Sequence, residues 1–316
     1  MKIPKGTGIE GTGMEGIVPS LNTPFAQDGS VDHASLRRLV DHTVAAGCGG
    51  MLGLAVAGEY AMLGFEEKTA MIETIAATNS DRIPFIVSVT APDLAETLDL
   101  SSVARSAGAR GVCVQVPAGF ARHEALVFLN DVAARGPGLL MVQDLDWAGP
   151  GRTLEDIVFL HENIEAFSWL KIETSQAGVK YTAVLNATNG ALNVCGGWAV
   201  TQLMDALARG VQAFIPTGME RIYVAIFRRF KSGDVAGARA LFERVLPVLN
   251  FSNQHIDISI RFFKELRKAE GLFESGKCRQ PGAVFDPVQE SEAAIAMGRA
   301  LVLAREIDMD VAGLSS

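Results

Sequence analysis

Short apolar runs with strand-forming side chains alternate along the chain with segments in which apolar residues repeat every three or four positions. Eight such runs predict β-strands, at residues 16–21, 49–54, 85–89, 111–116, 139–144, 167–173, 191–195 and 213–216. Helical apolar spacing lies between them, at residues 32–46, 66–77, 94–107, 123–134, 154–162, 200–208 and 221–230. Glycine follows Ala46, Ala107 and Arg209, as is common just past a helix. The pattern predicts a series of βα units.

Alternating strands and helices predict a parallel sheet in an α/β protein. Eight units within residues 15–235 favour a closed (β/α)8 TIM barrel over an open, doubly wound sheet. An open sheet would usually carry a glycine-rich phosphate loop after its first strand, whereas this strand runs into Asn22, Thr23, Pro24 and Phe25. We therefore expect the barrel.

The two ends of the chain have other patterns. Residues 1–14 are rich in glycine and threonine without periodicity and predict a flexible leader. After residue 235 the strand pattern stops, and helical spacing at 236–250, 255–269 and 291–307 predicts three helices. We expect residues 236–316 to form a helical extension that packs on the barrel.

The sixth predicted strand, with the sequence Phe-Ser-Trp-Leu-Lys-Ile-Glu-Thr, contains a lysine and a glutamate two positions apart. Lys171 and Glu173 therefore project from the same face of the strand. A lysine buried among apolar residues can be held partly neutral, the form that attacks a carbonyl carbon to make an imine. A purely structural Lys171–Glu173 ion pair fits the stretch as well. The barrel favours the catalytic hypothesis, because barrel enzymes place their chemistry at the C-terminal strand ends.

Other strand ends supply further candidates. The second strand ends near Gly58 and Glu59, where the glutamate has either a site role or a role at the start of the next helix. Polar Gln143 and Asp144 end the fifth strand, and a site role is favoured for both. Gly196 and Gly197 follow the seventh predicted strand, and Thr217 follows the eighth. At both places, the residues fit either a close approach to a substrate or a tight turn.

Composition narrows the classes of partner. The net charge of −8 and the absence of a Lys/Arg cluster argue against nucleic acid. No apolar run is long enough to span a bilayer. The four cysteines form no CxxC motif and no secretory signal is present, which favours a reduced, cytoplasmic protein. The five histidines lack metal-ligand spacing, so we expect no metal site.

Residues 15–300 resemble the dihydrodipicolinate synthase/N-acetylneuraminate lyase superfamily of class I aldolases and dehydratases. The resemblance is carried by the opening Gly-Ile-Val-Pro-Ser-Leu-Asn-Thr-Pro-Phe at 16–25, by Gly58-Glu59, by Lys171 on the sixth strand and by the three-helix tail. It implies that Lys171 forms a Schiff base with the 2-keto group of a pyruvate-like substrate. It also implies a homotetramer or a dimer.

The chain departs from the family synthases at two strand ends. Where they usually carry Gly-Thr-Thr-Gly-Glu, this chain has Ala-Val-Ala-Gly-Glu at 55–59, and their Tyr-Asn on strand five aligns with Gln143 and Asp144. The missing hydroxyls argue against the ordinary synthase mechanism. The sequences Met-Val-Gln-Asp at 141–144 and Leu-Lys-Ile-Glu-Thr at 170–174 are similar to those of 2-keto-3-deoxy sugar acid dehydratases, notably L-2-keto-3-deoxyarabonate dehydratase. That branch carries Asn-Phe-Ser-Glu where this chain has residues 56–59.

The resemblance therefore implies a lyase that dehydrates a 2-keto-3-deoxy sugar acid through a lysine imine, with no metal or other cofactor. Glu173, Glu59 and Asp144 are candidate bases, and Gln143 is a candidate hydrogen-bonding residue. Substrate contacts are expected from Ala57, Gly58, Asp144, Gly196, Gly197 and Thr217. The alternatives are a pyruvate-dependent aldolase and a binding barrel that has lost activity.

Overall fold

The eight expected strands form one parallel barrel in the computed structural model, which describes residues 13–197 and 201–311. The strands are β1 (Gly16–Ile17), β2 (Met51–Gly53), β3 (Phe85–Ser88), β4 (Gly111–Gln115), β5 (Leu139–Asp146), β6 (Phe167–Thr174), β7 (Asn193–Gly196) and β8 (Ala213–Phe214). They pair in the order β1-β8-β7-β6-β5-β4-β3-β2. A parallel bridge from Ser20 to Leu52 joins the chain after β1 to β2 and closes the ring. The predicted (β/α)8 fold is confirmed.

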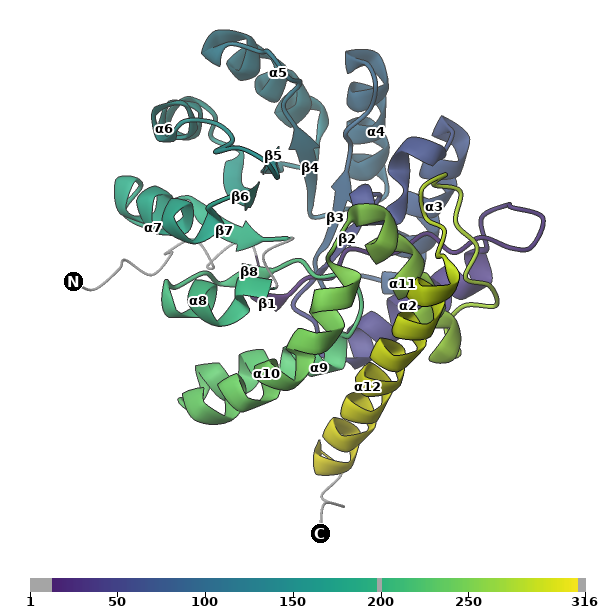
Figure 1. Cartoon of the computed structure of the whole chain (residues 1–316). Coiled ribbons are helices and arrows are strands. Elements are labelled where there is room, and N and C mark those ends of the chain that lie inside the picture. Colours follow the sequence, from purple (N-terminus) through teal and green to yellow (C-terminus); the bar gives the residue numbers. More distant parts are fainter. Residues whose placement is uncertain (1–12, 198–200, 312–316) are drawn as a thin grey trace.

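The helices surround the strands, as Figure 1 shows. They are α2 (His33–Ala45), α3 (Phe65–Asn79), α4 (Leu94–Ser106), α5 (Arg122–Arg135), α6 (Leu154–Asn163), α7 (Ala177–Ala187), α8 (Leu203–Ala208) and α9 (Glu220–Lys231). Each helix expected from the spacing overlaps one of these. Helix α7 was not among the expected helices, although its buried residues follow helical spacing: Ala177, Tyr181, Val184 and Leu185.

Each strand contributes side chains to two packing layers, one inside the barrel and one against the helices, because successive side chains point to opposite faces. On β6, Leu170 and Ile172 face the helices and join the outer core, whereas Trp169 lies in the core inside the barrel. The same alternation on β5 puts Val142 outside and Met141 inside. Lys171 and Glu173 therefore continue the inward row of Trp169.

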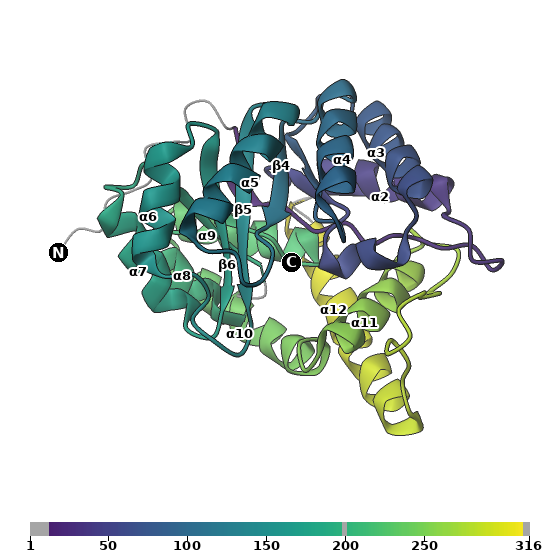
Figure 2. The same cartoon turned by 90° about the horizontal axis from the view of Figure 1, so that it is seen from above.

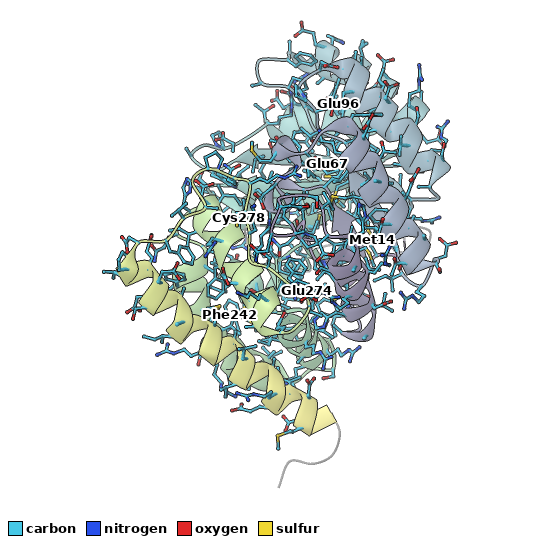
Figure 3. The ribbon with its side chains drawn as sticks, turned by 90° about the vertical axis from the view of Figure 1, so that its right-hand side faces the viewer. Met14, Glu67, Glu96, Phe242, Glu274 and Cys278 are labelled. Carbon is cyan, nitrogen blue, oxygen red and sulfur yellow. The ribbon has the colours of Figure 1, made fainter. Side chains whose placement is uncertain are left out.

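Three further helices pack against one side of the barrel: α10 (Val235–Ser252), α11 (Ile256–Ala269) and α12 (Pro287–Val311). Figure 2 shows them together on that side. The loop between α11 and α12 lies against the start of α3, where the Arg279 guanidinium contacts the Glu67 carboxylate at 2.6 Å. Figure 3 faces this side and labels Glu67 and Cys278 from the two segments.

Most of the predicted leader, residues 1–12, lies outside the described residues. Of the two described residues at its end, Met14 is fully buried and packs in the core inside the barrel. Among the helices of the described ranges, none combines the length and apolar character needed to cross a membrane.

Candidate active site at the C-terminal end of the barrel

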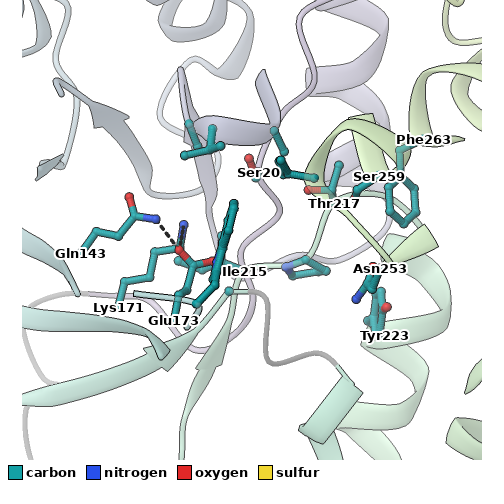
Figure 4. A pocket seen from close by; sticks show the side chains of 17 residues that line it. Ser20, Gln143, Lys171, Glu173, Ile215, Thr217, Tyr223, Asn253, Ser259 and Phe263 are labelled. Carbon is teal, nitrogen blue, oxygen red and sulfur yellow. Dashed lines mark hydrogen bonds and ion pairs between the residues drawn. The ribbon is translucent and has the colours of Figure 1, made fainter. Parts of the chain in front are cut away.

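Lys171 and Glu173 meet inside the barrel mouth. The Lys171 ammonium nitrogen lies 3.4 Å from Oε2 of Glu173, and both side chains are more than 90% buried. The side-chain amide of Gln143, on the neighbouring strand β5, donates a hydrogen bond to the same Glu173 oxygen. The strand register places Gln143 directly beside Lys171. Figure 4 shows the three side chains together at one end of a pocket.

A second glutamine extends this group to β4. The Gln115 amide nitrogen donates to the Gln143 side-chain oxygen over 3.2 Å. With its oxygen occupied by this donor, Gln143 has its NH2 group directed at Glu173. The chain of amides fixes the orientation of the carboxylate without adding charge.

Opposing effects act on the charge of Lys171. Burial has the largest single effect on the Lys171 pKa and lowers it. The Glu173 carboxylate is the main cause that raises the same pKa. The raising effects together outweigh burial, so the pKa lies above its ordinary value. Burial raises the pKa of the neighbouring Cys113 thiol to about 12, so this thiol is neutral at neutral pH. The expectation that burial leaves Lys171 partly neutral is thus wrong for this state of the site. Its proton must be transferred before it can attack a carbonyl.

The two glycines at the end of β7, Gly196 within the strand and Gly197 after it, have different positions. Gly197 lines the pocket, and a Cβ there would overlap the Glu173 carboxylate and lie 2.7 Å from Cε of Lys171. Gly197 is therefore needed for the Lys171–Glu173 pair to fit. Gly196 belongs to the barrel ladder, where its carbonyl accepts from Ile215 N at 2.7 Å, and it does not line the pocket.

Some residues of the loop after β2 line the pocket, and others only pack within the protein. Ala57 lines the pocket together with Ala55 and Val56. Gly58 does not; its carbonyl accepts from the Thr23 hydroxyl at 2.5 Å, and a Cβ would lie 2.9 Å from the Leu21 carbonyl oxygen. Its smallness serves loop packing rather than substrate contact.

Glu59 does not line the pocket that contains Lys171. Its carboxylate pairs with the Lys264 ammonium of α11, and both side chains are fully buried. The other carboxylate oxygen accepts from the backbone N–H groups of Arg279 and Gln280, at 2.7 and 2.6 Å. The predicted catalytic role of Glu59 does not fit this position, since its acceptor sites are taken up by a scaffold that joins the loop to α11.

Asp144 also lies outside the pocket. Because β5 alternates, Gln143 points inward and Asp144 points outward. Its carboxylate pairs with Lys180 of α7 and accepts from Arg152 N at 2.9 Å. The predicted roles of Asp144 as a substrate ligand or a base do not fit this geometry. It instead anchors the loop after β5 to α7.

The opposite end of the pocket contains residues that sequence reasoning missed. Thr217, expected there, lines it after β8. Across the whole pocket, the additional residues come from the segments after β1, β2, β5 and β8, from α9 and α11, and from the residue that follows α10: Ser20, Val56, Trp147, Ile215, Pro216, Tyr223, Asn253, Ile256, Ser259 and Phe263. Spacing of Ile256, Ser259 and Phe263 by three and four positions marks one face of α11. That pattern predicts a buried face, but not that the face meets Lys171.

Comparison with known proteins agrees with this architecture. Residues 13–297 match the Dihydrodipicolinate synthetase family, so the chain belongs to that family. It is similar to L-2-keto-3-deoxyarabonate dehydratase from Azospirillum brasilense, at 27% identity over 305 residues, which cover 93% of this chain and 94% of the relative. A 4-hydroxy-tetrahydrodipicolinate synthase from Neisseria meningitidis is 28% identical over 247 residues, covering 74% of this chain and 82% of that protein.

A solved structure shows the same fold. The dihydrodipicolinate synthase from Rhodopseudomonas palustris superposes with a TM-score of 0.83 at 22% identity, covering 91% of this chain and 98% of that one. The chain is thus an enzyme, a lyase of the Dihydrodipicolinate synthetase family.

Proposed function

We propose that this member of the Dihydrodipicolinate synthetase family is a Schiff-base-forming lyase that acts on a 2-keto acid, with Lys171 as the nucleophile. One observation carries the proposal: Lys171 is a buried lysine that opens into a pocket at the C-terminal strand ends beside Glu173. A buried ammonium with one carboxylate partner and access to a ligand is suited to imine chemistry.

The first half of the reaction uses the geometry directly. Glu173 accepts the Lys171 proton, and the neutral amine adds to the C2 carbonyl to give a carbinolamine. Glu173 then returns the proton to the carbinolamine hydroxyl, which leaves as water and gives a protonated imine with Glu173 again ionised. The imine draws electrons from C3, so that a C3 proton can pass to Glu173 and an enamine forms. Gln143 holds the carboxylate in place through its donated hydrogen bond. The imine supplies the electron withdrawal that a metal ion would supply in another mechanism.

The second half distinguishes two reactions. In dehydration, the enamine expels the C4 hydroxyl, which leaves as water with the proton that Glu173 carries, and hydrolysis of the imine frees the product. Aldol cleavage branches one step earlier, at the protonated imine: a base takes the C4 hydroxyl proton, the C3–C4 bond breaks to release an aldehyde, and the electrons form the enamine on Lys171. That enamine takes a proton at C3, and hydrolysis of the imine then releases pyruvate.

Dehydration of a 2-keto-3-deoxy sugar acid is the reaction that we propose, with aldol cleavage as the alternative. Support comes from the relative aligned over 93% of the chain, which is named a dehydratase of this type. Val56 and Ala57 line the pocket with aliphatic side chains and so provide no hydroxyl for the proton relay implied for the synthases. We further propose that the enzyme works in the cytoplasm, without a metal or other cofactor, as a homotetramer or dimer.

Product analysis tests the reaction. The protein is incubated with 2-keto-3-deoxy pentonic and hexonic acids, and the products are identified by mass spectrometry. We expect a product that has lost one water and no release of pyruvate; pyruvate with an aldehyde would support the aldolase alternative. Lys171→Met is the matched control, and turnover that survives in this variant would overturn the proposal.

A further inference from the structure

The pocket has two chemically different ends. Lys171, Glu173 and Gln143 gather at one end in Figure 4, while Thr217, Tyr223, Asn253, Ser259 and Phe263 gather at the other, with Ser20 and Ile215 between them. The first end comes from strands. The second comes mostly from α9, α11 and the residue that follows α10. A ligand that spans the pocket meets ionised groups first and a helical wall afterwards.

Buried hydroxyl groups face this space. Tyr223 is fully buried on α9, and its phenol oxygen has no hydrogen-bond partner among the described residues. The hydroxyl of Ser20 is likewise unpartnered there, and Ser20 is only 4% exposed. Buried polar atoms are ordinarily hydrogen-bonded, because burial without a partner costs free energy. Both residues line the pocket, so a ligand with hydrogen-bonding groups can supply the missing partners of their hydroxyls.

The same end carries no charge. Within the described lining, the ionisable side chains of acidic or basic type are Lys171 and Glu173, both at the strand end. The helical wall instead offers neutral polar groups on Thr217, Asn253 and Ser259. A carboxylate or phosphate buried against it would lose its hydration without meeting a cation, which is unfavourable. Hydroxyl groups, which both donate and accept, match these neutral partners.

Apolar side chains complete the wall. Ile256 and Phe263 of α11 and Ile215 after β8 line the space beside the hydroxyl groups. Such a mixture of apolar surface and a few placed polar groups is typical of small-molecule sites. It suits a carbon chain that carries hydroxyls, whose C–H groups contact the apolar side chains.

We infer that this helical wall is a specificity subsite for a neutral, hydroxylated chain on the far side of the substrate from its 2-keto group, with Tyr223 as its central hydrogen-bonding residue. The inference rests on the proposed function and deepens it. It assigns a polyhydroxylated 2-keto acid as substrate and disfavours 2-keto acids that end in a second carboxylate or a phosphate. Tyr223 acts here as a binding residue rather than in the chemistry at Lys171.

Borohydride trapping tests the subsite without depending on turnover. The full chain is titrated with pyruvate, with 2-oxopentanoate and with a 2-keto-3-deoxy pentonic acid, and the half-saturating concentration of each is read from the reduced adduct on Lys171. Tyr223→Phe removes only the phenol oxygen. Tyr60→Phe is the matched control, because Tyr60 does not line the pocket. Thermal unfolding of each variant checks that the fold is retained.

We expect Tyr223→Phe to raise the half-saturating concentration of the hydroxylated acid roughly three- to tenfold, the worth of one hydrogen bond. Pyruvate and 2-oxopentanoate, which carry no hydroxyl, should keep theirs, and Tyr60→Phe should change none of the three. Equal effects on all three acids, or no effect on any, would overturn the subsite while leaving the imine intact. Failure of the unaltered protein to form any adduct would instead overturn the proposed function, and the subsite with it.

Discussion

Among the described residues, two buried lysine–glutamate pairs have different surroundings. Lys264 and Glu59 are fully enclosed, and each has further partners: the Lys277 carbonyl accepts from Lys264 at 3.0 Å, and two backbone N–H groups donate to Glu59. Lys171 and Glu173 line a pocket. Burial lowers the pKa of Lys264 and outweighs the opposing effect of Glu59, whereas the pKa of Lys171 is raised on balance.

This contrast teaches that a perturbed lysine is not by itself a nucleophile. A lowered pKa belongs to the lysine that no ligand can reach, and a raised one to the lysine that faces the pocket. Access for a ligand, and a partner able to take the proton, separate the two roles. The aromatic ring of Phe25, 4.1 Å from the Lys264 nitrogen, completes the enclosure of the structural pair.

Replacing each lysine by methionine should affect imine formation in one pair and not in the other. Lys171→Met removes the nucleophile, so we expect turnover and imine trapping to be abolished. Lys264→Met keeps Lys171 and should keep trapping. Steady-state assays and mass spectrometry of both purified variants make the comparison. Loss of trapping only in Lys264→Met would reverse the two assignments.

The variant Glu173→Gln tests whether Glu173 acts as a base and raises the pKa of Lys171. We expect kcat to fall by about 10²- to 10⁴-fold, the usual contribution of a general base. The carboxylate favours the charged lysine, so its removal leaves burial, which lowers the pKa of Lys171. Imine trapping requires the neutral amine, and its pH midpoint should therefore move to lower pH.

The direction of this shift is checked by measuring imine trapping as a function of pH in the unaltered protein and in Glu173→Gln. The Gln143→Glu variant, which adds a second carboxylate beside Lys171, serves as the reverse control and should move the midpoint to higher pH. A midpoint that rises in Glu173→Gln would contradict the proposed electrostatics.

Removal of the structural lysine should show mainly in stability. Lys264→Met leaves the buried Glu59 carboxylate without its cation, and such a loss costs about 3–5 kcal/mol of unfolding free energy. Chemical denaturation measures it. The double variant Lys264→Met with Glu59→Gln removes both charges and should recover part of the loss. A double variant no more stable than the single one would argue against charge as the cause.

Asp144→Asn gives the smallest expected effect on activity. The residue anchors a loop through Lys180 and Arg152 and lies outside the pocket. We therefore expect a moderate loss of stability, about 1–3 kcal/mol, with kcat and KM nearly unchanged. Chemical denaturation and steady-state kinetics, both measured on one preparation, separate the effect on stability from the effect on catalysis. A large fall in kcat with unchanged stability would restore Asp144 to the site.

Local periodicity explains what the sequence could predict. Alternation along β6 places Lys171 and Glu173 on one face, and the same rule applied to β5 would have separated Gln143 from Asp144. Substrate contact at Gly197 stays a prediction. The structure adds a separate reason for glycine there, because a Cβ would overlap the Glu173 carboxylate.

The helical wall of the pocket could not be predicted in this way. Tyr223 and Ser259 lie on separate helices, and only the packing of the C-terminal helices on the barrel brings both to the pocket. The pairing of Glu59 with Lys264 joins residues about two hundred positions apart and has no local signal. A sequence pattern identifies the buried face of an element but not the partner that covers it.

Borohydride reduction in the presence of pyruvate, followed by intact mass measurement and peptide mapping, identifies the lysine that forms the imine. We expect a single reduced adduct, on Lys171 and not on Lys264. Absence of an adduct with pyruvate and with larger 2-keto acids, or an adduct on another lysine, would contradict it.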